Sequence, residues 1–136
     1  MKTLILLISL LFFFSGSQAQ KQAASEEKVL TAEDGNLSVS VHKDGTCYFM
    51  YQNGMSSKKD ERTIIFKNKQ DIRSFEKKIS KALSAKDGTS DLIIYKTYKI
   101  RLLTEMGGVF MIVNETGQFQ STLRISKEMY GQVNAL

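Results

Sequence analysis

The most reactive side chains in this sequence are a single histidine, His42, and a single cysteine, Cys47. They flank the segment Lys43-Asp44-Gly45-Thr46, which is typical of a tight hairpin turn. If Asp44 and Gly45 form a two-residue turn, His42 lies directly opposite Cys47, with the two Cβ atoms about 5 Å apart. A neighbouring imidazolium lowers the pKa of a thiol and makes it nucleophilic, so the pair defines a thiol-enzyme hypothesis. A longer loop or a bulge would break the pairing, and no second histidine or orienting group supports it, so we expect a non-enzymatic protein.

Metal ligation is the second chemistry to consider. The spacing H-x-D-x-x-C formed by His42, Asp44 and Cys47 matches no closed set of zinc ligands. Soft ligands for Cu(I) are offered by Met50, Met55, Met106, Met111 and Met129. Most of these methionines fall inside strand or helix patterns, where methionine usually fills the core. The sequence also lacks phosphate-binding, dinucleotide-binding and nucleophile-elbow motifs, and we expect no cofactor and no metal.

A row of cations is the third candidate for chemistry. Lys69, Arg73, Lys77 and Lys81 recur every four residues and would line one face of a helix. Like charges at this spacing destabilise a helix by a few tenths of a kcal/mol per pair, so another influence must tolerate them. One interpretation is a patch that binds polyanions such as lipopolysaccharide, acidic glycans or extracellular nucleic acid. The other is the ordinary solvated face of an amphipathic helix.

The helix that would carry these cations has the clearest pattern in the chain. Its apolar positions, Ile72, Phe75, Ile79, Ala82 and Leu83, fall on one face at helical spacing. Asn68 stands where an N-cap would stand, and the Asp87-Gly88 pair follows as a stop signal. We therefore predict a helix over about 69–85.

Strand patterns surround that helix. Alternating or continuous apolar residues predict strands at 37–42, 47–51, 62–67, 91–104, 109–113 and 118–125. Ser126 can cap a short C-terminal helix that carries Met129, Tyr130 and Val133. The sequence thus predicts an α+β fold with an antiparallel sheet or sheets of about six strands, the main helix being packed on a sheet face.

The two halves of the chain run in the same order, and this suggests a possible βββα-βββα arrangement. Thr63 matches Thr122 at the start of similar strands, and Gly45 matches Gly108 in similar turns. Either a duplication or the chance recurrence of a common pattern would produce this order. Over about residues 37–136 the pattern resembles the organisation of PUR repeats, which are single-stranded nucleic-acid-binding modules. The resemblance implies short twisted strands that are followed by a helix in each half, and no PUR motif is present from which site residues could be carried over.

An export signal opens the chain. Lys2 is followed by an apolar run from Leu4 to Phe14, and Ser17-Gln18-Ala19 forms a small-x-small cleavage site. The apolar run is about half the length that crosses a bilayer, so we predict a cleaved signal peptide over 1–19 and no transmembrane segment in the mature chain. A polar, flexible lead-in over 20–36 and a single small domain over 37–136 follow. The junction resembles signals of Gram-negative bacteria, which implies the periplasm, the cell surface or the medium.

The net charge of the 136-residue chain is only +5. Seven cations and two anions fall within residues 67–86, so the basic helix accounts for most of this excess. We expect an exported binding domain that recognises a protein or an envelope component through a sheet face or an exposed edge. Phe49, Tyr51 and Tyr95 are the expected anchors, on a face that the helix does not cover. Polyanion binding by the helix is the alternative, and the sequence identifies neither the partner nor the oligomeric state.

Overall fold

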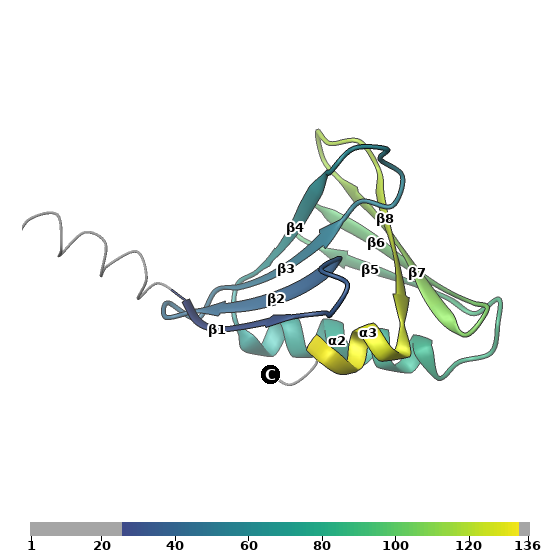
Figure 1. Ribbon diagram of the computed structural model, residues 1–136, viewed down its shortest axis with the longest axis horizontal. Coiled ribbons are helices and arrows are strands. Elements are labelled where there is room, and N and C mark those ends of the chain that lie inside the picture. The colour runs from purple at the N-terminus through teal and green to yellow at the C-terminus, as the bar shows by residue number, and fades with distance from the viewer. Residues whose placement is uncertain (1–25, 134–136) are drawn as a thin grey trace, which may run out of the picture.

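Each half of the chain forms an antiparallel meander of four strands that is followed by a helix (Figure 1). The structure is a computed structural model, and it describes residues 26–133. The elements of the first half are β1 (Glu26–Thr31), β2 (Leu37–His42), β3 (Cys47–Gln52), β4 (Glu61–Phe66) and α2 (Lys69–Leu83). Those of the second half are β5 (Ser90–Tyr95), β6 (Tyr98–Glu105), β7 (Gly108–Glu115), β8 (Ser121–Ser126) and α3 (Lys127–Val133).

The α+β class, the antiparallel pairing and the two helices are confirmed. The count of about six strands is wrong, because the described residues form two sheets of four strands each, in the orders β1-β2-β3-β4 and β5-β6-β7-β8. The repeated unit is therefore ββββα rather than βββα. We call the two sheets the first sheet and the second sheet.

The first additional strand is β1, which lies inside the segment expected to be a flexible lead-in. Val29 pairs with Ser40 and Leu30 with Val39, so residues 26–31 belong to the first sheet. Their sequence, EEKVLT, contains only two apolar residues and has no period of its own. The strand forms because β2 supplies its hydrogen-bond partners, which a local pattern cannot reveal. Residues 20–25 and the expected signal peptide lie outside the described residues.

The second additional strand arises because the segment 91–104, expected to be one strand, is a hairpin. Tyr95 pairs with Tyr98, and Lys96 between them takes a positive φ of 51°. A lysine rarely adopts this left-handed conformation, and no glycine marks the turn.

The two sheets lean against each other and the helices close the open side between them (Figure 1). Helix α2 packs against β4 of the first sheet and against β6 and β7 of the second, whereas α3 packs against β1, β2 and β8. Each helix therefore contacts both sheets, and the two halves share one core. Within residues 26–133, the other face of each sheet packs against neither helix.

Helix α2 begins and packs as its sequence predicts. The Asn68 side chain accepts a hydrogen bond from the Asp71 amide at 2.8 Å, which is the expected N-cap. Phe75 lies in the core between Phe49 and Phe66, with ring centroids 5.2 and 5.1 Å away. The apolar face of α2 thus packs on the inner face of the first sheet. Every second residue of β3, namely Cys47, Phe49 and Tyr51, points into this inner face and is buried.

Candidate functional site

The cationic stripe of α2, which we define as Lys69, Arg73, Lys77 and Lys81, lies at the surface. All four side chains are exposed, on the side of the helix opposite the buried Ile72, Phe75 and Ile79. The structure thus brings together the residues that helical spacing groups, and this arrangement can attract anions.

The three expected anchors do not form an exposed group. Phe49 is 0% exposed and packs edge to face on Phe75, and Tyr51 is 2% exposed. Tyr95 is half-buried, and its hydroxyl donates to Asp71 at 2.8 Å and accepts from the Lys67 amide at 2.9 Å. The prediction that these residues lie on an uncovered face is wrong, because alternation separates the two faces of β3 without showing which one the helix covers.

The pairing of His42 with Cys47 is also wrong. Val41, not His42, lies opposite Cys47. The His42 amide donates to the Thr46 carbonyl at 2.9 Å, so three residues, 43–45, form the turn instead of the two that were expected, and Gly45 takes a φ of 89°. A shift of one residue turns each side chain to the other face. Cys47 is fully buried, which raises the pKa of its thiol, and His42 packs instead on Tyr48 with ring centroids 4.3 Å apart. The imidazole of His42 therefore does not face the thiol of Cys47, and this arrangement does not activate the thiol.

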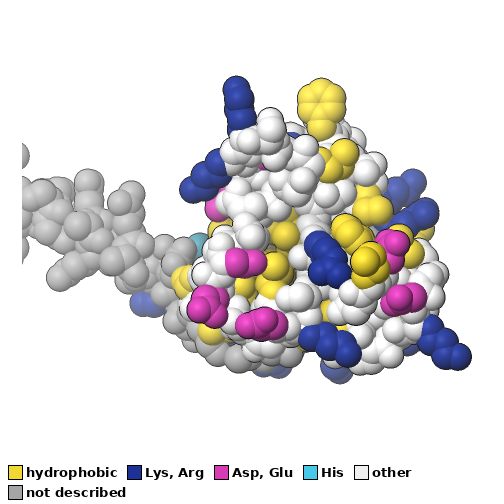
Figure 2. Space-filling model, turned by 45° about the vertical axis from the view of Figure 1, so that its right-hand side comes forward, with side chains coloured by type: hydrophobic (Ala, Val, Ile, Leu, Met, Phe, Trp, Pro, Cys, Tyr) yellow, Lys and Arg dark blue, Asp and Glu magenta, His cyan; other side chains and the backbone are white. Residues whose placement is uncertain are grey.

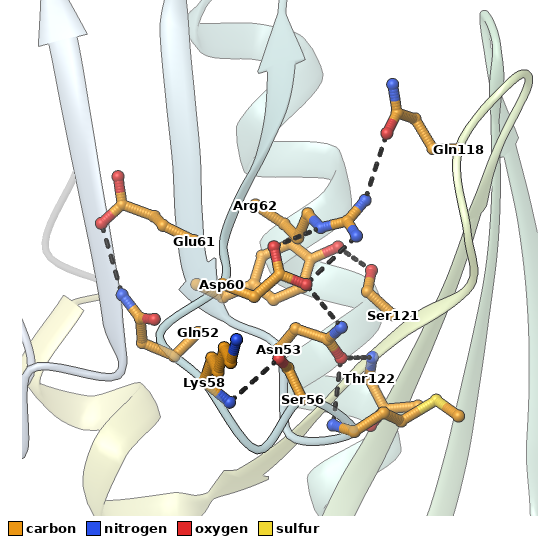
Figure 3. Close-up of polar contacts among 12 residues, drawn as sticks. Gln52, Asn53, Ser56, Lys58, Asp60, Glu61, Arg62, Gln118, Ser121 and Thr122 are labelled. Atoms are coloured by element: carbon orange, nitrogen blue, oxygen red, sulfur yellow. Dashed lines mark hydrogen bonds and ion pairs between the residues drawn. The ribbon is translucent and has the colours of Figure 1, made fainter.

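A polar network around Asn53, where the two sheets meet, has a structural role (Figure 3). Asn53 Oδ1 accepts from the amides of Met55 and Thr122, at 3.1 and 3.0 Å. Its Nδ2 donates to Asp60 at 2.9 Å, and Asp60 in turn forms an ion pair with Arg62 at 2.9 Å. Hydrogen bonds from Arg62 and Asn53 hold the pKa of Asp60 below its usual value. These groups satisfy one another and tie the β3–β4 loop to β8, so they are not arranged as an acid–base pair.

The second sheet carries a different kind of surface, which sequence reasoning missed. We call it the outer face, and it consists of the side chains of the second sheet that point away from the core. Its apolar members are Leu92, Ile94, Leu103, Phe110 and Ile112, and its polar members are Ser90, Lys99, Arg101, Glu105, Asn114, Thr122, Arg124 and Ser126. Strand register aligns them in rows such as Leu92–Arg101–Ile112–Thr122. Alternation in β6 and β7 could have identified these rows once the segment 91–104 was divided.

Three of the four charged side chains of the outer face are positive. Lys99, Arg101 and Arg124 stand among the apolar side chains, and Glu105 comes only at the border, at the end of β6. Arg124 lies over the Phe110 ring at 5.8 Å and donates to the Met106 carbonyl at 2.9 Å. Figure 2 shows hydrophobic and basic side chains side by side on this side of the molecule, with acidic side chains next to them. Such a surface favours a partner that offers both negative charge and apolar groups.

Exposed apolar residues continue to the edges of this face. Ile94 is 69% exposed and Leu92 50%, both on the edge strand β5. Met106, in the β6–β7 turn, is 76% exposed and has a left-handed φ of 51°. Met106 and Gly107, with φ of 51° and 74°, form the two-residue loop between the paired Glu105 and Gly108, and a tight hairpin turn of this kind has positive φ at both positions.

Two further findings bear on the class of site. Within residues 26–133, no group of three or more His, Cys, Asp or Glu side chains is placed to hold a metal ion. In the same part of the chain, no helix combines the length and the apolar character needed to cross a bilayer.

Comparisons of the chain with protein-family models, with curated proteins and with solved structures find no match in any of the three. No family is therefore assigned, and function has to be argued from the geometry.

Proposed function

We propose that this chain is an exported, non-enzymatic binding domain that recognises a protein or another envelope component through the outer face of the second sheet. The observation that supports the proposal most directly is the combination of Lys99, Arg101 and Arg124 with five apolar side chains on a sheet face that neither described helix covers. Cations that stand among apolar groups add electrostatic selectivity to hydrophobic contact.

The outer face of the first sheet offers a useful contrast. It presents Ser38, His42, Tyr48 and Gln52, which are polar or amphipathic, together with the partly buried Met50, and Ser40 on the same face is buried. Its exposed apolar residues, Val29 and Ile65, stand on opposite edge strands. The second sheet is thus the better candidate for a contact surface, because its apolar groups are contiguous.

Charge reversal on the outer face tests the proposal. The double variant Lys99→Glu with Arg101→Glu would be compared with wild type as bait for detergent-solubilised envelope proteins and lipopolysaccharide, with quantitative mass spectrometry as the readout. The matched control is Arg73→Glu with Lys77→Glu, which makes the same change of charge on α2. We expect the outer-face variant to lose specific partners that wild type and the control retain. Identical partner sets for all three proteins would contradict the proposal.

A second candidate function is polyanion binding by the cationic stripe of α2. It is supported by the exposure of all four cations along one side of the helix. The two surfaces lie on different sides of the second sheet, because α2 packs on its inner face. Separate charge reversals can therefore distinguish them.

A further inference from the structure

The edge strands of the two sheets differ in the hydrogen bonds that their outward main-chain groups make with the rest of the domain. On β4, the Ile65 amide donates to the Tyr98 hydroxyl at 3.4 Å, so a side chain of the second sheet meets this edge. On β8, the amide of Thr122 donates to Asn53 and its carbonyl accepts from Gly54 at 2.7 Å. The β4 edge is therefore hydrogen-bonded to the second sheet and the β8 edge to the β3–β4 loop, so each edge has part of its main chain occupied.

The free edge of β5 has no such cover within the described residues. The Thr104 amide donates to the Thr89 carbonyl at 2.9 Å, so the carbonyl of Thr89, the residue before β5, points toward β6. Alternation along an antiparallel ladder then directs the main-chain N–H and C=O groups of Ser90, Leu92 and Ile94 away from β6. No partner for these groups occurs among residues 26–133. This edge can accept main-chain hydrogen bonds from another strand, and donate them.

The two sides of this edge differ in chemistry. On the outer side stand the exposed apolar side chains of Leu92 and Ile94. On the inner side, a groove of about 300 Å³ runs between β5 and the C-terminal part of α2. Lys78 and Lys81 line this groove, with Ala82 and Ala85 between them and β5. Asp91 pairs with Lys78 at 3.4 Å, and no ion pair of Lys81 occurs in the described part of the chain.

We propose that β5 takes up an extended polypeptide segment as an additional strand, and that this segment alternates apolar and acidic residues. The apolar side chains would pack beside Leu92 and Ile94, as cross-strand neighbours do, and the acidic ones would enter the groove beside Lys78 and Lys81. The groove contributes two cations and one anion, so it favours an acidic segment over a basic one. This inference rests on the proposed function, because it assumes that the partner is a protein. It adds that the partner is bound by main-chain hydrogen bonds to β5.

A defined peptide tests the added strand. The probe is an eight-residue, end-blocked peptide that alternates isoleucine and glutamate, and its affinity is measured by fluorescence anisotropy. Leu92→Pro removes the outward N–H, whereas the control Leu92→Ala removes the same side chain and keeps that N–H. We expect Leu92→Pro to weaken binding at least tenfold and Leu92→Ala about two- to threefold. Equal affinities of the two variants would overturn the proposal.

The second arm leaves the protein unchanged, in case Leu92→Pro does not fold. N-methylation of the peptide at alternate positions should abolish binding in one of the two possible sets and spare it in the other, because only one set of N–H groups faces β5. Amide chemical shifts of wild type should move at Ser90–Tyr95. Shifts confined to the exposed side of α2, or equal effects of both methylation sets, would refute strand addition.

Two outcomes separate this inference from its alternatives. If the peptide does not bind while Lys99→Glu with Arg101→Glu still abolishes partner capture, strand addition is wrong and the proposed function stands. If sedimentation shows a wild-type dimer that Leu92→Pro dissociates, a second copy of the chain occupies β5, and the acidic segment is the wrong occupant.

Discussion

The hydroxyl groups of Tyr51 on β3 and Ser121 on β8 lie 2.7 Å apart in the core and join the two sheets. Both residues are buried, at 2% and 3% exposure. Loss of either hydroxyl leaves the other without a partner, which costs about 1–3 kcal/mol. We expect Tyr51→Phe and Ser121→Ala each to lower the free energy of unfolding by about 1–2 kcal/mol in urea denaturation.

A double variant, Tyr51→Phe with Ser121→Ala, tests whether the two hydroxyl groups stabilise each other. The double variant should lose less stability than the two single variants together, because it leaves no orphaned hydroxyl. Strictly additive losses would show that the hydrogen bond does not couple the sheets.

Glu76 predicts an unusual dependence of stability on pH. Its side chain is buried on α2, Oε1 has no hydrogen-bond partner among residues 26–133, and burial raises its pKa to about 7. Since the folded state binds this proton more tightly than the unfolded state, the contribution to stability is present below about pH 4.5 and is lost as the pH rises to about 7.

Removal of this charge should therefore stabilise the domain in alkaline solution. Glu76→Gln should raise the free energy of unfolding by about 1–2 kcal/mol relative to wild type at pH 8 and change it little at pH 5. Chemical denaturation at both pH values checks this, with the exposed Glu105→Gln as the control. A difference between Glu76→Gln and wild type that is the same at both pH values would contradict the assignment.

The cationic stripe of α2 predicts salt-dependent retention on polyanions. Arg73→Glu with Lys77→Glu should lower the salt concentration that elutes the domain from heparin or immobilised lipopolysaccharide, because two of the four cations that attract the matrix become anions. Lys99→Glu with Arg101→Glu is the control of equal net charge. If the helix variant elutes like wild type, the stripe is only a solvated helix face.

Cys47 predicts an inert thiol. It is fully buried and its pKa is raised by burial, so the thiolate is scarce at neutral pH. Iodoacetamide should label native protein far more slowly than urea-unfolded protein between pH 6 and about pH 9, as followed by intact mass. Rapid labelling of the native protein below about pH 8 would instead restore the thiol-enzyme hypothesis.

Local spacing in the sequence was sufficient for the helix and for most strands. Asn68 and the apolar residues from Ile72 to Leu83 each lie three or four residues, or fewer, from the next, so their pattern predicts α2 and its cap directly. The exposure of Lys69, Arg73, Lys77 and Lys81 follows from the same spacing. These features depend on residues at i+3 and i+4, which a single segment contains.

The tertiary structure decided what depends on distant partners. A two-residue period shows that Phe49 and Tyr51 share a face, but only the packing of α2 determines that this face is the core. One additional loop residue turned Cys47 away from His42, and pairing with β2 made a strand of residues 26–31. The outer face and the free edge of β5 emerge only when four strands lie in register, because they are assembled from residues that are far apart in the chain.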